Sequence, residues 1–266
     1  MAQLDILIPT YRRPAALAVT LASVAAQAFR PFHVVVSDQS EEAESARGAE
    51  THAVVRLLRA QGREVELVRN LPRRGMAQQR QFLLDRARSR YALFLDDDVI
   101  LEPDVVGRLV RAIEDERCGF VGCGLIGLSF VDDVRPHEQA IELWEGPVRP
   151  ERLRPEDGAW ARHRLHNAAN LLHVQRRLGP GERKYKVAWI GGCILYDTAK
   201  LRAAGGFSFW RELPQHHAGE DALAQLRVME RFGGCGLLPS GAYHQELPTT
   251  VADRRVDAPT ALDEAA

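Results

Sequence analysis

The sequence has little of what marks several protein classes. Its four cysteines show neither a Cys-x-x-Cys spacing nor a histidine-rich companion, so we expect no structural zinc and interpret them as small buried apolar residues. No stretch approaches the ~20 apolar residues needed to cross a bilayer, although peripheral contact with a membrane stays open. Because 35 basic and 36 acidic residues leave a net charge of −1 and no basic block stands out, nucleic acid is not an expected partner.

The first residues also lack the basic region and apolar core of a secretory signal, since Met-Ala-Gln-Leu-Asp leads directly into an apolar segment. We therefore expect a cytoplasmic protein. The 266 residues, 45% hydrophobic and 27% charged, have the composition of a globular protein and suit one large α/β domain or two smaller ones. Nothing in this composition indicates an oligomeric state.

The first half alternates short apolar segments with helical patterns. Strands are expected at 4–8, 34–36, 65–68 and 91–95, and helices after Pro14, over about 43–61, from about 75 to 88 and beyond Pro103. Strands separated by helices of this length pair in parallel through right-handed crossovers. The sequence thus predicts an α/β fold with a doubly wound, mainly parallel central sheet flanked by helices.

The second half is less regular. Strands are expected at 119–128 and 187–196, and helices at about 198–204 and 219–232. The segment 136–186 has weak periodicity, and an irregular stretch of this length usually marks a functional or mobile region. Residues 251–266 are expected to form a polar tail.

Polar residues follow the predicted strands of the first half where each strand ends. They are Thr10-Tyr11-Arg12-Arg13, Asp38, Asn70 to Arg74, and Asp96-Asp97-Asp98. Ligands of open α/β sheets bind at the carboxyl ends of strands, so we expect these residues to meet at one edge. Neither Gly-x-Gly-x-x-Gly after the first strand nor a Walker lysine motif is present, which removes the main support for dinucleotide-binding and P-loop functions.

The strongest single signal is the run Asp96-Asp97-Asp98 after an apolar strand. Three adjacent carboxylates repel one another, and a hard divalent cation that carries a diphosphate relieves this repulsion through oxygen ligation. In extended chain Asp96 and Asp98 would point one way and Asp97 the other, which favours the outer pair for ligand contact. A solvated acidic turn is the alternative.

Several motifs occur in a fixed order over most of residues 5–245. They are Ile8 to Pro14, Asp38, Asn70 to Gln79, Phe94 to Asp104, Gly191-Gly192, and Gly219-Glu220-Asp221. In this order they resemble the family-two, inverting glycosyltransferases of the GT-A fold. The resemblance implies one catalytic domain over 1–250, with a nucleotide-sugar-binding half at 1–115 and a smaller acceptor-binding and catalytic-base half at 116–250.

On the donor side the resemblance implies contacts to the nucleotide sugar from Pro9, Thr10, Tyr11, Arg13, Asp38, Arg74, Asp96 and Asp97. Asp38 would hydrogen-bond the base, although a plain turn role is open for it and for Arg74, and Arg73 can take the place of Arg74. For Tyr11, a role in core packing is as well supported as stacking on the nucleotide base. Asp98, within a DxD motif, would bind Mn²⁺ or Mg²⁺, and His244 would complete the metal shell.

On the acceptor side the resemblance makes Asp221 the general base that deprotonates an acceptor hydroxyl, with Glu220 orienting it or contacting the acceptor. Plain capping is the alternative, because this acidic pair opens a helix, and the helix N-terminus is expected to lower the pKa of Asp221. Further substrate contacts are expected from Trp189, Gly191, Gly192 and Trp210. Core packing is an equal alternative for the two tryptophans.

Taken together, the resemblance implies a metal-dependent glycosyltransferase. It would move a sugar from a nucleotide diphosphate donor, UDP-sugar by default, to a hydroxyl or amine with inversion at the anomeric carbon. The acceptor can be a small molecule, a lipid-linked carrier or a glycan. Two alternatives are a nucleotidyltransferase of similar fold, whose glycine-rich basic loop Pro9-Thr10-Tyr11 does not supply, and a non-catalytic nucleotide- or sugar-binding module.

Overall fold

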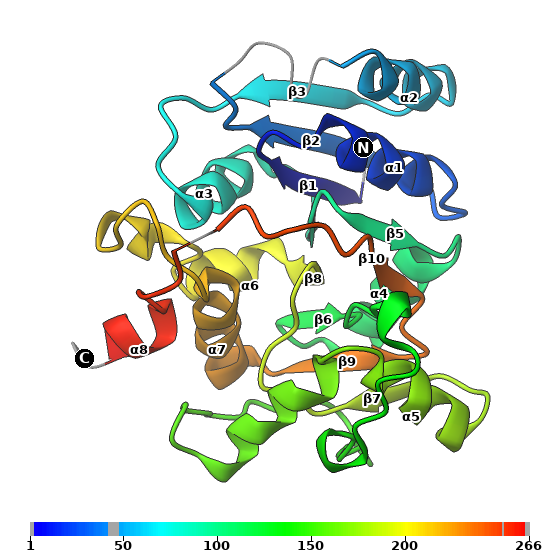
Figure 1. Ribbon diagram of the computed structural model, residues 1–266, viewed down its shortest axis with the longest axis vertical. Helices are drawn as coiled ribbons and strands as arrows, with labels where there is room; N and C mark the ends of the chain where they lie inside the picture. The colour runs from blue at the N-terminus through cyan, green and yellow to red at the C-terminus, as the bar shows by residue number, and fades with distance from the viewer. Residues whose placement is uncertain (1–2, 42–47, 252, 264–266) are drawn as a thin grey trace.

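A mixed central sheet organises the computed structural model, which describes residues 3–41, 48–251 and 253–263 (Figure 1). Its strands are β1 (Leu4–Thr10), β2 (Phe32–Asp38), β3 (Val65–Arg69), β4 (Tyr91–Leu95), β6 (Phe120–Gly122), β7 (Arg183–Tyr185), β8 (Cys193–Asp197) and β9 (Gly234–Leu238). They lie in the order β3-β2-β1-β4-β8-β6-β9-β7. The two halves of the chain therefore meet where β4 lies beside β8.

The N-terminal half of this sheet is parallel, as predicted. β1 pairs in parallel with β2 and β4, and β2 pairs in parallel with β3. The connecting helices are α1 (Pro14–Ala25), α2 (Ala49–Ala60) and α3 (Met76–Arg86), and α4 (Val105–Glu116) follows. The expected start of the second helix, residues 43–47, lies outside the described residues. Parallel pairing brings the carboxyl ends of β1, β2 and β4 to one edge.

Hydrophobic side chains cover both faces of the sheet. Along β1, Leu4, Ile6 and Ile8 join the core beneath α1, α2 and α4, whereas Leu7 joins the core beneath α3 and α7 (Glu220–Phe232). Every residue of β1 is buried. A strand covered on both faces explains why the sequence there reads as a continuous apolar run.

The C-terminal half of the sheet is mixed rather than parallel. β8 runs antiparallel to β4 and β6, and β7 runs antiparallel to β9, while β6 and β9 are parallel. The strand expected at 187–196 begins only at Cys193, because Gly192 has a φ of +76° that breaks extended chain. The strand expected at 119–128 is shortened to β6. The cysteines are buried and free, as expected: Cys118, Cys123, Cys193 and Cys235.

Smaller elements complete the fold. They are the antiparallel pair β5 (Val99–Leu101) and β10 (Ala242–His244), the helices α5 (Asn170–Leu178), α6 (Thr198–Ala203) and α8 (Ala258–Asp263), and the short 3₁₀ helices, among them η3 (Gly158–His166). Because His244 lies opposite Val99 in this pair, the β10 strand places it next to Asp98. Within the described parts of the chain, no helix has the length and apolar character needed to cross a membrane.

The segment after β10 packs against the domain. Figure 1 shows it crossing from β10 to α8 between the two halves. Ala218 and Asp257 form a parallel bridge, and Ala258 is fully buried in the core shared with α7. The sequence assigned residues 251–266 to a polar tail; in the structure the described part of this segment is held against α7.

A buried polar pair lies at the opposite edge of the sheet. Asp5 Oδ1 lies 3.1 Å from His33 Nδ1, and Asp5 Oδ2 accepts hydrogen bonds from the backbone N–H groups of Arg88 (2.6 Å) and Ser89 (2.7 Å). Burial favours a higher pKa for Asp5, but the hydrogen bonds outweigh it and the pKa is lowered. The hydrogen bond to Asp5 outweighs burial at His33 and raises the pKa of that imidazole.

We expect Asp5→Asn to lower the free energy of unfolding at pH 6 by about 1–3 kcal/mol, because it removes the hydrogen bonds that a buried carboxylate accepts. A raised His33 pKa stabilises the fold below the unfolded value of ~6.5, and this contribution is lost as pH rises through the folded pKa. Urea unfolding should therefore show a smaller deficit for Asp5→Asn at pH 9 than at pH 6. In a His33→Gln background the deficit should be equal at both pH values; a pH-independent deficit in the His33 protein would contradict the linkage.

Candidate active site

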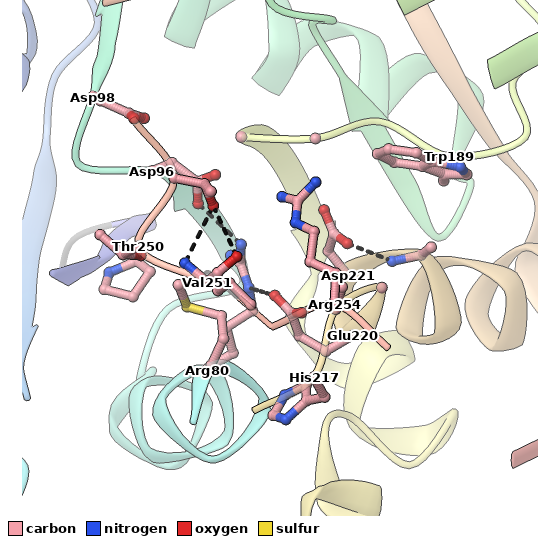
Figure 2. Close-up of a pocket in the computed structure, with 18 of the residues that line it drawn as sticks. Arg80, Asp96, Asp98, Trp189, His217, Glu220, Asp221, Thr250, Val251 and Arg254 are labelled. Atoms are coloured by element: carbon pink, nitrogen blue, oxygen red, sulfur yellow. Dashed lines mark hydrogen bonds and ion pairs between the residues drawn. The ribbon is translucent and has the colours of Figure 1, made fainter. Parts of the chain in front are cut away.

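The carboxyl ends of β1 and β4 and the N-terminus of α7 border one cavity of ≈ 620 Å³ (Figure 2). Most residues proposed from the sequence line it: Pro9, Thr10, Tyr11, Arg13, Asp96, Asp97, Asp98, Trp189, Gly191, Gly192, Glu220, Asp221 and His244. Three do not, namely Asp38, Arg74 and Trp210. The fold thus brings both predicted halves of the site to one space.

The three residues outside the cavity have other surroundings. Asp38 is buried at the end of β2, where its Oδ1 accepts hydrogen bonds from the backbone N–H (2.8 Å) and hydroxyl (2.6 Å) of Ser40. The Arg74 guanidinium lies 5.8 Å from the centroid of the Trp210 ring. Arg73 instead lies 3.8 Å from the centroid of the Tyr11 ring. Of the two arginines, Arg73 is therefore the one whose guanidinium lies over the ring of a cavity-lining residue.

The three adjacent aspartates differ in their partners, although Arg13 Nη1 lies near both Asp97 Oδ1 (3.5 Å) and Asp98 Oδ2 (2.5 Å). The chain turns at Asp97 and Asp98, so the alternation expected for extended chain does not apply. Asp97 Oδ2 accepts a hydrogen bond from Thr10 Oγ1 at 2.6 Å. Burial raises the pKa of Asp97 to about 7, against the effects of Thr10 and Arg13. Asp97 is thus held against β1, while its neighbours contact other elements.

Asp98 is paired with two side chains. Its Oδ2 lies 2.5 Å from Arg13 Nη1 and 3.4 Å from His244 Nε2. Burial favours a higher pKa for Asp98, but hydrogen bonds from His244 and Arg13 outweigh it and the pKa is lowered. Asp98 is therefore an ionised carboxylate at the cavity wall, with the Arg13 guanidinium as its counter-charge.

The ring orientation of His244 bears on its expected role as a metal ligand. Nδ1 accepts a hydrogen bond from the Glu246 N–H group at 2.8 Å, so the proton of the neutral ring is on Nε2, which faces Asp98. A cation on Nε2 would require the proton on Nδ1, where the Glu246 N–H group already lies. In this orientation His244 is placed as a donor to Asp98, and its expected role as a metal ligand stays a prediction.

The residues present fit a cation at Asp98 that shares its ligands with a substrate. Among the residues that the structure describes, no group of three or more His, Cys, Asp and Glu side chains lies close enough to hold a metal ion. The Asp98 carboxylate is a ligand that hard divalent cations prefer, and it lies in an open cavity. A cation there needs further oxygen ligands from outside the chain, and a diphosphate supplies them.

Asp221 lies in the first turn of α7 and faces the cavity (Figure 2). Its Oδ1 accepts a hydrogen bond from the Ala222 N–H group at 2.8 Å. Burial and the charges of Glu220 and Asp96 raise its pKa to about 7, outweighing Arg80 and the helix N–H group. The expectation of a lowered pKa is therefore wrong: the helix N–H group does act in that direction, but desolvation is the larger effect. A carboxylate in this state can accept a proton near neutral pH.

Arg80 is a site residue that the sequence reasoning missed. It lies on α3 with 3% of its side chain exposed, and it contacts Glu220 Oε1 through Nε (3.0 Å) and Asp96 Oδ1 through Nη2 (2.9 Å). A signal was present, because Arg80 follows Ala77 by three residues and precedes Leu84 by four, which places it on the buried stripe of the helix. A charge on such a stripe requires buried partners.

The segment after β10 also lines the cavity. Its lining residues are Leu247, Thr249, Thr250, Val251, Arg254, Asp257 and Pro259. Figure 2 shows Thr250, Val251 and Arg254 beside Asp96 and Glu220. Arg13 Nη2 donates to the Pro248 carbonyl oxygen. The polar composition of this segment gave no sequence signal for a role at the site.

The chain resembles a known protein family and several solved structures. The model of the family described as "Glycosyl transferase family 2" matches residues 5–172. Among solved structures, S. aureus TarS 1–349 in complex with UDP-GlcNAc superposes with a TM-score of 0.59 at 16% identity, covering 94% of this chain and 60% of that chain. The mannosyltransferase PcManGT from Pyrobaculum calidifontis, in complex with GDP-Man and Mn²⁺, gives 0.57 at 16% identity, with coverage of 94% and 59%.

The chain matches only part of the length of the solved structures. No curated protein matches this chain. The chain spans 36% of the full S. aureus TarS structure and about 60% of the shorter solved chains. At these identities the structural likeness shows the GT-A fold, which confirms the fold class expected from the sequence.

Proposed function

The chain belongs to glycosyl transferase family 2, and on that premise we propose that it is a metal-dependent glycosyltransferase that transfers a sugar from a nucleotide diphosphate donor to an acceptor hydroxyl or amine with inversion. One observation carries the proposal: the Asp221 carboxylate and the Asp96 to Asp98 cluster line the same ≈ 620 Å³ cavity. A cation-binding carboxylate and a base on one cavity are what displacement of a nucleoside diphosphate requires.

The donor we propose is a UDP-sugar. Pro9, Thr10 and Tyr11 line the cavity at the end of β1, and the Tyr11 ring with the Arg73 guanidinium 3.8 Å from its centroid provides a flat surface on which a base can stack. The TarS complex with UDP-GlcNAc supports a uridine nucleotide in the donor. Because the PcManGT complex contains GDP-Man, the experiment below also includes guanosine nucleotides.

Asp98 would hold the divalent cation, Mn²⁺ or Mg²⁺, together with donor phosphate oxygens. When bound, such a cation stabilises the negative charge on the departing nucleoside diphosphate. Arg13 lies beside Asp98 and presents a guanidinium that can pair with phosphate oxygens. His244 orients the Asp98 carboxylate through Nε2.

Asp221 accepts the proton of the acceptor hydroxyl while that oxygen attacks the anomeric carbon. Attack from the side opposite the leaving diphosphate inverts the configuration, which requires base and diphosphate on different sides of the sugar. Trp189 and the Gly191-Gly192 segment line the cavity with Asp221, and an indole face packs well against the apolar face of a sugar ring. Trp160 and His163 lie on η3 and line the same cavity. The segment 136–186, expected to be irregular, contains η3, α5 and β7.

The experiment is a thermal-shift panel of nucleoside diphosphates and their sugars, each with and without Mn²⁺. We expect one diphosphate to raise the Tm only with the metal, by about 5–10 °C near 100 times its Kd. Its sugar is then incubated with acceptors from the three proposed classes, and free nucleoside diphosphate is measured. No metal-dependent shift with any donor contradicts the proposal, and pyrophosphate release from a nucleoside triphosphate would indicate a nucleotidyltransferase instead.

A further inference from the structure

Arg80 connects the two ends of the cavity. Its guanidinium contacts Asp96, which follows β4, and Glu220, which opens α7, and it comes from α3, a third element (Figure 2). Glu220 is 140 residues away in the sequence and Asp96 is 16 residues away. Through one side chain, the donor side of the cavity and the helix that carries Asp221 are therefore linked.

The charges around Arg80 make this link more than a local ion pair. Burial disfavours its charge, but Asp96, Glu220 and Asp221 outweigh burial and raise its pKa well above the usual range, so Arg80 remains a cation. Three carboxylates face one guanidinium at this point. Loss of the guanidinium would leave Glu220, which is buried, as a negative charge without this counter-charge.

The same charges act on Asp221. Besides Glu220 on its own helix, the groups that face it are Arg80 from α3, Asp96 after β4 and the Tyr196 hydroxyl from β8. Arg254, from the C-terminal segment, lines the same cavity. Burial, Glu220 and Asp96 favour the protonated form of Asp221, whereas Arg80 and, to a smaller extent, the Ala222 N–H group favour the ionised form that a base requires.

The geometry of the contacts favours arginine over any other cation. Nε and Nη2 are separate donors of one planar group, and they bind Glu220 and Asp96 at 3.0 and 2.9 Å. A planar guanidinium fixes two carboxylates relative to each other, whereas a lysine ammonium is a point charge on a flexible stem. The identity of this residue therefore matters beyond its charge.

We propose that Arg80 is a positioning residue for transfer, which rests on the proposed function: by binding Asp96 and Glu220 together it holds the base Asp221 at a fixed place relative to the bound donor. Its hydrogen bonds go to these two carboxylates, so it acts on Asp221 through them. Its role is to fix the donor side of the cavity relative to α7, and so to keep Asp221 in the position and the ionised state that a base requires.

Arg80→Lys tests this proposal, with Arg108→Met as the matched control. Arg108 is another arginine with 3% side-chain exposure, and it binds carbonyl oxygens of Pro239 and Ser240 away from the cavity. We expect Arg80→Lys to keep donor Kd within about 3-fold and to lower kcat by about 10–100-fold, since a misplaced reacting group can cost ~10²-fold. Arg108→Met should lower the Tm and leave kcat unchanged.

A second readout does not need activity. Carboxyl carbon NMR titration of the aspartates, with Asp221 assigned by its absence in Asp221→Asn, should show the Asp221 midpoint shifted upward in Arg80→Lys and unshifted in Arg108→Met. Glu220→Gln, which keeps Arg80 but weakens the link, should also lower kcat and covers the case that Arg80→Lys does not fold.

The outcomes separate this inference from the proposed function. Wild-type protein that releases no nucleoside diphosphate with any donor and acceptor refutes the function, and the NMR midpoint still decides whether Arg80 holds Asp221. Active wild-type protein with an Arg80→Lys variant of equal kcat and equal Asp221 midpoint overturns the inference alone. A fall in kcat that Arg108→Met reproduces would assign Arg80 a structural role only, and it also overturns the inference.

Discussion

Asp221→Asn is expected to abolish sugar transfer and leave donor binding intact. A general base contributes about 10²–10⁴-fold to rate, so kcat should fall by ~10³-fold. Asparagine has the size of aspartate, and its carbonyl oxygen can still accept the hydrogen bond from the Ala222 N–H group. The measurements are kcat with the donor identified by thermal shift, and donor Kd in the presence of Mn²⁺ by calorimetry.

The pH dependence gives the same prediction a second form. Because the pKa of Asp221 is raised to about 7, the base is protonated below this pH and ionised above it. The wild-type rate should rise with pH through about 7 and then level off, and the residual rate of Asp221→Asn should lose this rise. Asp85→Asn, an exposed carboxylate on α3 outside the cavity, is the control and should follow the wild type. Normal transfer by Asp221→Asn would show that another group is the base.

Elements whose residues all lie in the same kind of environment could be predicted from the sequence. β1 and β4 are covered on both faces, so their residues form apolar runs, and each run stops where the chain reaches the cavity at Thr10 and at Asp96. The second half has no apolar run of this kind that matches a strand from end to end. The strand expected from residue 187 starts at Cys193, because the positive φ of Gly192 and its contact with Leu125 depend on the neighbouring loop. Local pattern therefore fixes the donor half better than the acceptor half.

The candidate site shows the same division. Asp98 was singled out because it follows the end of a strand, and Asp221 because the family resemblance implied a base there; both line the cavity. The state of these residues was not found: the raised pKa of Asp221 comes from burial among Glu220 and Asp96, which are brought together only by tertiary packing. Arg80 was missed for the same reason, because its two partners lie 16 and 140 residues away.

Asp98→Asn is expected to remove the metal dependence of donor binding. In the wild type, Mn²⁺ should lower the Kd of the nucleoside diphosphate, since under the proposed function Asp98 would hold the cation and the donor phosphates would supply further oxygen ligands. The amide lacks the negative charge that a hard cation prefers, so the variant should bind the donor equally with and without Mn²⁺, and kcat should fall by about 10³-fold, consistent with several kcal/mol of transition-state charge stabilisation. Calorimetric titrations with and without Mn²⁺, together with release of nucleoside diphosphate, measure both effects.

His244→Gln distinguishes the two roles considered for the histidine. If His244 is a donor that orients Asp98, the substitution should lower metal affinity by about 10–100-fold, the range usual for loss of a group that supports a ligand. As a direct ligand, its loss should approach the effect of Asp98→Asn. Because Nδ1 already accepts the Glu246 N–H group, we expect the smaller effect. Asp115→Asn, an exposed carboxylate on α4, should change neither Kd nor kcat, and Mn²⁺-dependent binding that survives in Asp98→Asn would place the cation elsewhere.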